Sequence, residues 1–181
     1  MNTFNVPTRE EVSSQNQGNF DTLKKVLGMV PNLYATIAYS DHGLSRYLSF
    51  QNAKTSLSNK EKEAVNLVVS EVNGCRYCQS AHTVLGKMNG FPDEEIIHIR
   101  QGYSTNPKLN AMIVLAKEIT EKKGHVSEKA LNDFYSAGYN NGNLVDLILQ
   151  VSDKIAMNYL HNLTNIPIDF PIASTLEKEA A

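Results

Sequence analysis

The spacing of apolar residues is the feature that most restricts the fold of this chain. From Phe20 onward these residues recur three and four positions apart, and strict alternation of polar and apolar residues is scarce. The first spacing places side chains on one face of a helix, whereas alternation is typical of a half-buried strand. The sequence therefore predicts an all-α fold with no sheet. Helices are expected at 20–28, 33–39, 44–53, 58–73, 75–88, 92–102, 107–121, 127–137 and 143–160.

The clearest helix start and stop lie in the middle of the chain. Ser58 and Glu61 have the spacing of a capping box, in which each side chain accepts a hydrogen bond from the backbone N–H of the other residue. Asn73 and Gly74 tolerate the left-handed backbone that ends a helix. Because Cys75 follows at once, the sequence predicts two consecutive helices that fold back on each other at this turn.

Length, composition and charge restrict the organisation and the partners of the chain. Its 181 residues, 41% hydrophobic and 20% charged, suit one globular domain, here expected over 20–181 after a polar lead-in at 1–19. A net charge of -2 gives no basic surface for nucleic acid. No apolar run approaches the roughly 20 residues of a membrane span, and the polar N-terminus does not resemble a secretory signal. A cytoplasmic location is expected.

The last expected helix, at 143–160, is apolar around most of its circumference. A helix of this kind is usually buried. Two interpretations remain open, a central core helix and a core helix that also forms a subunit interface.

The two cysteines, Cys75 and Cys78, are the most informative residues for function. A disulfide between them would close a very short loop and would restrict the unfolded chain little. Both lie at the expected start of a helix, where free N–H groups and the helix dipole stabilise a thiolate. His82 follows four residues later on the same face and could accept the thiol proton. The cysteine pair is therefore predicted to be catalytic or metal-binding.

A carboxylate from the preceding helix could complete this site. Glu63 lies in an apolar stretch and could approach His82 once the helix pair folds back, where it would orient the imidazole or relay a proton. Glu71 is the alternative, although it lies nearer the turn and is expected to face solvent.

The cysteine pair has three other interpretations. Both could be small buried apolar residues. Cys75, Cys78, His82 and a glutamate could bind zinc, although structural zinc sites more often draw a second ligand pair from elsewhere in the chain. A thioredoxin-like site would require strands around the cysteines, and none is predicted.

The spacing of these residues resembles that of a known family. Glu63, eleven intervening residues, Cys75, Cys78 and then His82 match the pattern of the alkylhydroperoxidase AhpD-like proteins of the carboxymuconolactone decarboxylase superfamily. The segments Leu27–Leu33 and Asp169–Pro171 are similar to a longer, peroxidase-related branch. The resemblance extends over most of the chain from Phe20.

The resemblance implies an all-α, AhpD-like helical domain that forms a homo-oligomer, as a dimer, trimer or hexamer. It implies that Cys78 attacks a hydroperoxide, that Glu63 and His82 assist by proton transfer, and that Cys75 resolves the sulfenic acid as a disulfide. No bound cofactor or metal is implied. An external dithiol, such as a lipoyl group on a carrier protein, would reduce the disulfide. Some members have a histidine between the cysteines, where this chain has Arg76 and Tyr77.

Three functions follow as hypotheses. The first is a thiol-dependent peroxidase, and the second is a disulfide oxidoreductase without peroxide turnover. The third is a redox-sensing or metal-binding module. Decarboxylation ranks low, because the decarboxylases of the superfamily lack the cysteine pair that this chain contains.

Overall fold

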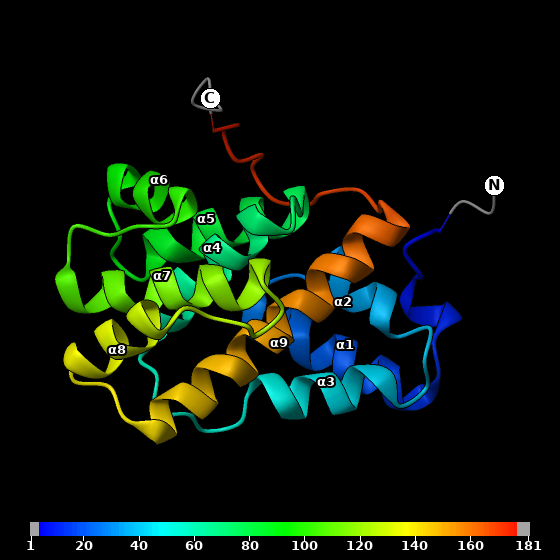
Figure 1. Ribbon diagram of the computed structural model, residues 1–181. Helices are drawn as coiled ribbons and strands as arrows, with labels where there is room; N and C mark the ends of the chain where they lie inside the picture. Colours follow the sequence, from blue (N-terminus) through cyan, green and yellow to red (C-terminus); the bar gives the residue numbers. More distant parts are fainter. Residues whose placement is uncertain (1–3, 177–181) are drawn as a thin grey trace. The chain divides into compact units, whose positions relative to one another are not determined.

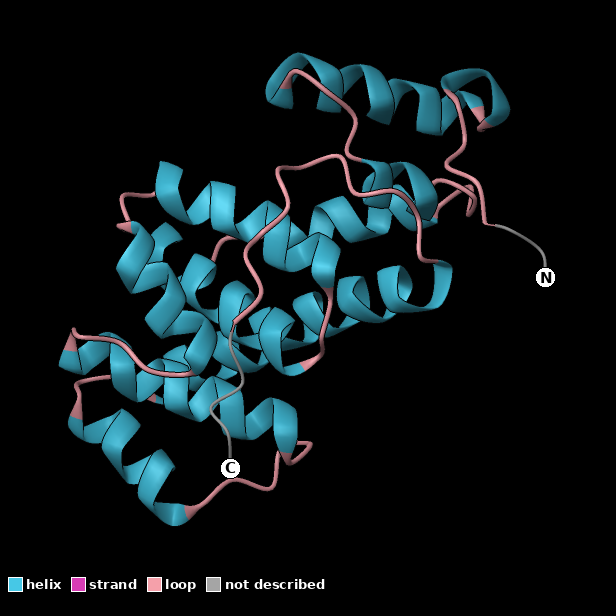
Figure 2. Ribbon diagram, turned by 90° about the horizontal axis from the view of Figure 1, so that it is seen from above, coloured by secondary structure: helices cyan, strands magenta, loops and turns pink. Residues whose placement is uncertain are grey.

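The computed structural model describes residues 4–176, and every regular element within them is a helix. Figure 1 shows the helices in chain order, and Figure 2 shows only helices and connecting loops over the same residues. The prediction of an all-α fold is confirmed. Within the same residues, no helix combines the length and apolar character needed to cross a bilayer.

Contacts divide the chain into two compact units. Among the described residues, the first comprises 4–54 together with 160–169, and the second comprises 55–159 together with 170–176. The expected single domain over 20–181 stays a prediction.

The first unit consists of short helices around a small apolar core. A single 3₁₀ turn at Arg9–Glu11 precedes α1 (Ser14–Leu27), α2 (Asn32–Ile37) and α3 (Gly43–Gln51). Its buried residues are Val12, Phe20, Leu23, Ala35, Ala38 and Leu44.

Helix α1 begins six residues before the expected start at Phe20, so the prediction of a loose lead-in is wrong for residues 14–19. Ser13 caps the helix, because its side chain accepts a hydrogen bond from the backbone N–H of Asn16. Asn16 is fully buried and donates from Nδ2 to the carbonyl oxygens of Ala38, at 2.9 Å, and Ser40, at 3.1 Å. The first turn of α1 is therefore held by a buried polar residue, and the spacing of apolar residues does not reveal this helix start.

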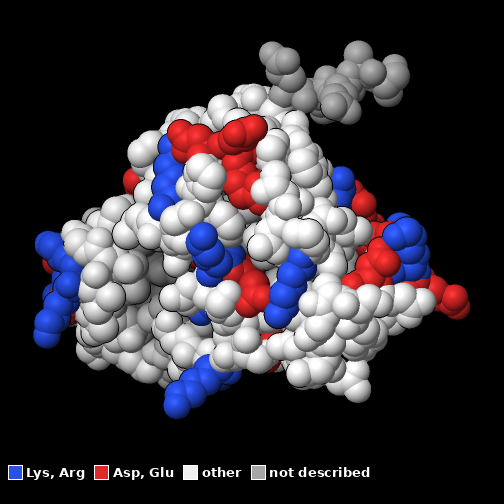
Figure 3. All heavy atoms as spheres, turned by 90° about the vertical axis from the view of Figure 1, so that its left-hand side faces the viewer, with Lys and Arg blue, Asp and Glu red and all other residues white. Residues whose placement is uncertain are grey.

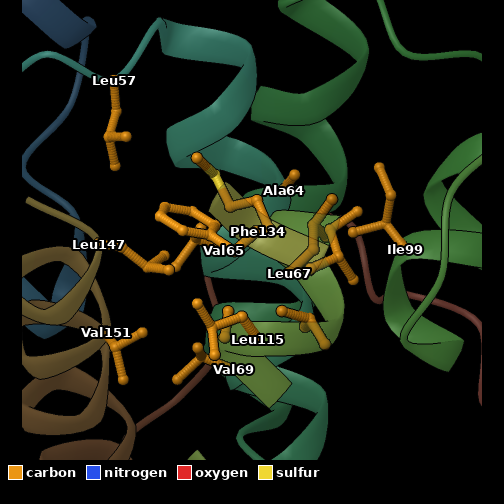
Figure 4. Packing of buried hydrophobic residues seen from close by; sticks show 14 of the residues in the cluster. Leu57, Ala64, Val65, Leu67, Val69, Ile99, Leu115, Phe134, Leu147 and Val151 are labelled. Carbon is orange, nitrogen blue, oxygen red and sulfur yellow. The ribbon is translucent and has the colours of Figure 1, made fainter. Parts of the chain in front are cut away.

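The second unit carries the larger core. It contains α4 (Asn59–Val72), α5 (Arg76–Met88), α6 (Asp93–Gln101), α7 (Pro107–Glu121), α8 (Glu128–Ser136) and α9 (Asn141–Thr164) as far as residue 159. Helix α4 is central, since it packs against α5, α6 and α7. Figure 4 shows the side chains that fill the space between these helices, and ten of them are labelled: Leu57, Ala64, Val65, Leu67, Val69, Ile99, Leu115, Phe134, Leu147 and Val151.

The start and the end of α4 follow the expected signals. The backbone N–H of Glu61 donates to Ser58 Oγ at 3.2 Å, and the backbone N–H of Ser58 donates to Glu61 Oε2 at 2.8 Å. The capping box is therefore confirmed. After the helix, Gly74 adopts a φ of +63°, which favours glycine. The chain then turns directly into α5, so the predicted helix pair is confirmed.

Helix α9 begins two residues earlier than expected. Asn140 and Asn143 exchange hydrogen bonds, since each backbone N–H donates to the side-chain oxygen of the other, at 2.9 and 3.1 Å. Asn143, the first residue of the expected helix, thus lies inside the first turn, and Asn140 precedes that turn.

Within this chain, α9 is buried on only part of its circumference. Leu147 and Val151 pack into the core, whereas Val145, Ile148 and Leu149 are 56%, 45% and 46% exposed. Apolar composition does not tell which side of a helix the chain covers. The interface interpretation of this helix stays a prediction.

Charged side chains of both signs are distributed over the surface. Figure 3 shows acidic and basic groups on one face of the described residues, with larger uncharged areas around them. This mixture agrees with the small net charge of -2.

Candidate active site

The turn between α4 and α5 places the two cysteines at a helix start. The backbone N–H of Cys75 donates to the carbonyl of Ser70 at 3.0 Å, which closes the turn. Cys75 then occupies the capping position of α5, and its Sγ accepts from the backbone N–H of Cys78 at 3.4 Å. Both cysteines are free thiols and are almost fully buried, Cys78 being 2% exposed. The local sequence therefore places two thiols one helical turn apart.

The two thiols differ in acidity. A hydrogen bond from the Cys75 thiol lowers the pKa of Cys78 to about 6, and the charges of Lys154 and His82 and a hydrogen bond from Asn158 act in the same direction against burial. The same thiol–thiol hydrogen bond, burial and the neighbouring Cys78 charge raise the pKa of Cys75. Near neutral pH, Cys78 is the thiolate and Cys75 is the proton donor to it.

A titration of the reduced protein should show this difference directly. Thiolate formation, followed by ultraviolet absorbance, is expected to occur in one step with a midpoint near pH 6 and to account for one thiol per chain. The Cys78→Ser variant should lack this step. A wild-type protein whose first thiolate forms only at the ordinary cysteine pKa of about 8.5 would contradict the assignment.

Glu63 and His82 meet across the helix pair. His82 Nδ1 lies 2.7 Å from Glu63 Oε2, although the residues are 19 positions apart. Asn66 donates from Nδ2 to Glu63 Oε1 at 3.3 Å, and Gln150 of α9 donates to Asn66 Oδ1 at 2.8 Å. Burial opposes the ionisation of Glu63, but the charge and hydrogen bond of His82, with Lys154 and Asn66, outweigh it and hold its pKa below the usual value. Glu63 thus orients the imidazole as a carboxylate.

Glu71, the alternative carboxylate, does not join this pair. Its Oε2 accepts a hydrogen bond from Arg100 Nε at 2.9 Å, and Arg100 also donates to the carbonyl of Ser174. Arg100 had no expected tertiary role, yet its side chain is buried and ion-paired. Because the chain folds back at Gly74, Glu63 contacts His82 and Glu71 contacts Arg100.

Helix α9 brings two further residues that the sequence did not reveal, Lys154 and Asn158. Both are buried. Asn158 donates from Nδ2 to Ser70 Oγ at 3.2 Å and accepts from Asn73 Nδ2 at 3.0 Å, so it ties α9 to the turn before the cysteines. A polar pair at 153–154 within an otherwise apolar helix was the available signal, since buried charges usually serve a purpose.

Residues 170–173 pack against the first turns of α5. The phenyl ring of Phe170 packs edge-on against Tyr77, with 5.6 Å between ring centroids. The backbone N–H of Ala173 donates to Ser80 Oγ at 3.1 Å, and its carbonyl accepts from Arg76 Nη2 at 2.7 Å. The two residues between the cysteines therefore hold this segment in place.

No group of three or more His, Cys, Asp or Glu side chains within residues 4–176 has an arrangement that could hold a metal ion. The site brings together a buried thiolate, an adjacent thiol, an imidazole oriented by a carboxylate and a buried lysine.

Comparison with known proteins agrees with this arrangement. Residues 41–118 match the model of the carboxymuconolactone decarboxylase family. These residues are similar to that family. Glu63, Cys75, Cys78 and His82 all lie within the carboxymuconolactone decarboxylase segment, whereas Lys154 and Asn158 lie beyond it. Among curated protein sequences, none matches significantly.

Solved structures share the AhpD-like fold over nearly the whole chain. An uncharacterized peroxidase-related protein with an alkylhydroperoxidase AhpD core, from Ralstonia eutropha JMP134, has a TM-score of 0.83 at 17% identity, covering 92% of each chain. A peroxidase-related protein from Silicibacter sp. TM1040 has a TM-score of 0.80 at 20% identity, covering 90% of this chain and 89% of its own. The debrominase Bmp8, in complex with 2,3,4-tribromopyrrole, has a TM-score of 0.77 at 14% identity, covering 93% and 92%.

The family and the fold expected from the cysteine motif are confirmed by these matches. At identities of 20% and below, the structural likeness shows the fold alone.

Proposed function

We propose that this protein is a thiol-dependent hydroperoxidase in which Cys78 is the nucleophile. The observation that carries the proposal is a buried pair of free thiols at the start of α5, in a site that also contains the Glu63–His82 pair. The pKa of Cys78, lowered to about 6, supports it. A thiolate attacks peroxides, whereas a thiol reacts poorly. The imidazole can supply the proton that the leaving group needs.

The first step forms an S–O bond and breaks the O–O bond. Cys78 Sγ attacks the terminal oxygen of the hydroperoxide and becomes a sulfenic acid, and the sulfur is oxidised as the peroxide is reduced. The alkoxide that leaves takes a proton from His82 and departs as an alcohol. Glu63, hydrogen-bonded to Nδ1, stabilises the protonated imidazole before this transfer.

The second step uses Cys75. Its sulfur attacks Cys78 Sγ, the S–O bond breaks, and hydroxide leaves with the Cys75 proton as water. The sulfurs already share a hydrogen bond one helical turn apart, which supports a short path to the disulfide. An external dithiol then exchanges with the disulfide, regenerates both thiols and leaves as its own disulfide.

The proposed electron donor is a dihydrolipoyl group, free or attached to a carrier protein. The scheme needs two electrons per peroxide and no bound cofactor, because the cysteine pair stores them. A dithiol suits this role, since its second thiol closes a ring and releases the mixed disulfide.

The test has two stages with the wild-type protein. Reduced protein mixed with one equivalent of cumene hydroperoxide is expected to lose both thiols and two hydrogens in mass, and excess dihydrolipoamide should then restore them and sustain turnover. Unchanged thiols after peroxide would contradict the proposal. A protein that instead exchanges disulfides with a model substrate, or that is purified with stoichiometric zinc, would be an oxidoreductase or a metal-binding module.

A further inference from the structure

Lys154 is a buried lysine on α9 that takes no part in the proposed bond-making and bond-breaking steps. Its side chain is 3% exposed, and it lies one helical turn before Asn158, which contacts the turn preceding the cysteines. Asp153, the adjacent residue, is 4% exposed, and its Oδ2 lies 4.0 Å from Lys154 Nζ. Two opposite charges are therefore buried together near the cysteine pair.

Burial of this kind needs a physical reason. An ammonium removed from water loses its hydration, and nearby anions must replace that stabilisation. Asp153 supplies one anion at ion-pair distance, and neither of its oxygens has a hydrogen-bond partner within the described part of the chain. Lys154 lies on α9 midway between Gln150, which donates to Asn66 on α4, and Asn158, which contacts Ser70 and Asn73 before the cysteines, so this face of α9 packs against α4 beside the site. The charge of Lys154 also favours ionisation of Glu63 and Cys78.

The acidic groups of the site are Glu63, hydrogen-bonded to His82, and Asp153, the ion-pair partner of Lys154. Both oppose a further negative charge. The Cys75 thiol, the imidazole of His82 and Lys154 favour it. Glu63 lies 2.7 Å from His82 and pairs with the imidazole.

We propose that Lys154 is a positioning residue whose buried ammonium keeps Cys78 ionised at neutral pH. This assignment rests on the proposed function only in taking Cys78 as the nucleophile. It gives α9 a direct part in the site, although α9 begins more than sixty residues after the cysteines in sequence. The position lies outside the segment that matches the family model.

The test measures thiolate formation at Cys78 by ultraviolet absorbance in reduced Lys154→Met and Lys154→Arg. Methionine keeps the length without the charge, whereas arginine keeps the charge. The midpoint is expected to rise by about one pH unit or more in Lys154→Met and to stay within about half a unit of wild type in Lys154→Arg. Lys129→Met is the matched control, because Lys129 is an exposed lysine paired with Asp133 on α8. An unchanged midpoint in Lys154→Met, or equal shifts in both variants, would overturn the proposal.

A second variant covers the case in which Lys154→Met fails to fold because Asp153 is left unpaired. The double variant Asp153→Asn/Lys154→Met removes both buried charges and is expected to retain a raised midpoint. If Lys154 had no effect, loss of the Asp153 charge alone would leave the midpoint at or below that of wild type. The titration uses no peroxide, so a raised midpoint in a protein without peroxide turnover would support the Lys154 assignment and reject the hydroperoxidase.

Discussion

Replacement of Cys78 by serine is expected to reduce hydroperoxide turnover with dihydrolipoamide to background, a loss of at least about 1,000-fold. A serine hydroxyl stays protonated at neutral pH and forms no sulfenic acid. Among the described residues, the only other cysteine is Cys75, whose pKa is raised by its hydrogen bond to Cys78, by burial and by the adjacent negative charge. The measurement is peroxide consumption under excess donor, compared with wild type.

Cys75→Ser is the matched control for this experiment, since it changes the same atom one helical turn away. It should still consume about one equivalent of peroxide, because the first step uses Cys78 alone. Turnover should then stop at a sulfenic acid that a dimedone probe can trap. If Cys75→Ser lost the first equivalent while Cys78→Ser kept it, the roles of the two cysteines would be exchanged.

The second large effect is expected at Glu63. Glu63→Gln should lower the rate of peroxide reduction about 100- to 10,000-fold, because a neutral amide neither stabilises a protonated His82 nor fixes its orientation. Glutamine has nearly the same shape as glutamate, so the side chain keeps Asn66 and His82 as neighbours. The loss should appear in the rate of sulfenic acid formation measured in single turnover.

Glu71→Gln provides the comparison on the same helix. Glu71 binds Arg100 and not His82, so its loss should lower thermal stability while leaving peroxide turnover within about tenfold of wild type. Equal losses of turnover in the two variants would show that the Glu63–His82 contact has no special part in the reaction.

The Glu63–His82 pair also predicts how stability depends on pH. Because the folded pKa of Glu63 lies below its usual value of 4.5, the pair stabilises the fold above that value, and the contribution is lost as the pH falls through the folded pKa. The thermal stability of the wild-type protein should therefore fall more on acidification than that of Glu63→Gln. An equal fall of the melting temperature with pH in both proteins would contradict this linkage.

Local interactions explain how far the sequence could predict the fold. The capping box at Ser58 and Glu61, the turn at Gly74 and the start of α5 at the cysteines all depend on groups within about four residues of one another. Such groups interact before tertiary structure forms, and the sequence displays them. The start of α1 was missed because Asn16 is held by carbonyls more than twenty residues away.

Packing decided the composition of the candidate site. The motif predicted that Cys75, Cys78 and His82 share a face, but both Glu63 and Glu71 remained candidates from the residues alone. The fold back of α5 on α4 pairs Glu63 with His82 and leaves Glu71 to Arg100. The spacing along a helix shows which residues share a face. Which side chains contact that face depends on how the neighbouring helix packs.

The sequence by itself determined the helical class, most helix boundaries and the cysteine turn, because these depend on periodicity and on caps between near neighbours. Tertiary structure alone decided that α9 leaves Val145, Ile148 and Leu149 exposed and that it delivers Lys154 and Asn158 to the site. These outcomes depend on contacts between residues more than seventy positions apart. Such contacts form only when whole helices pack, and no rule confined to neighbouring residues contains them.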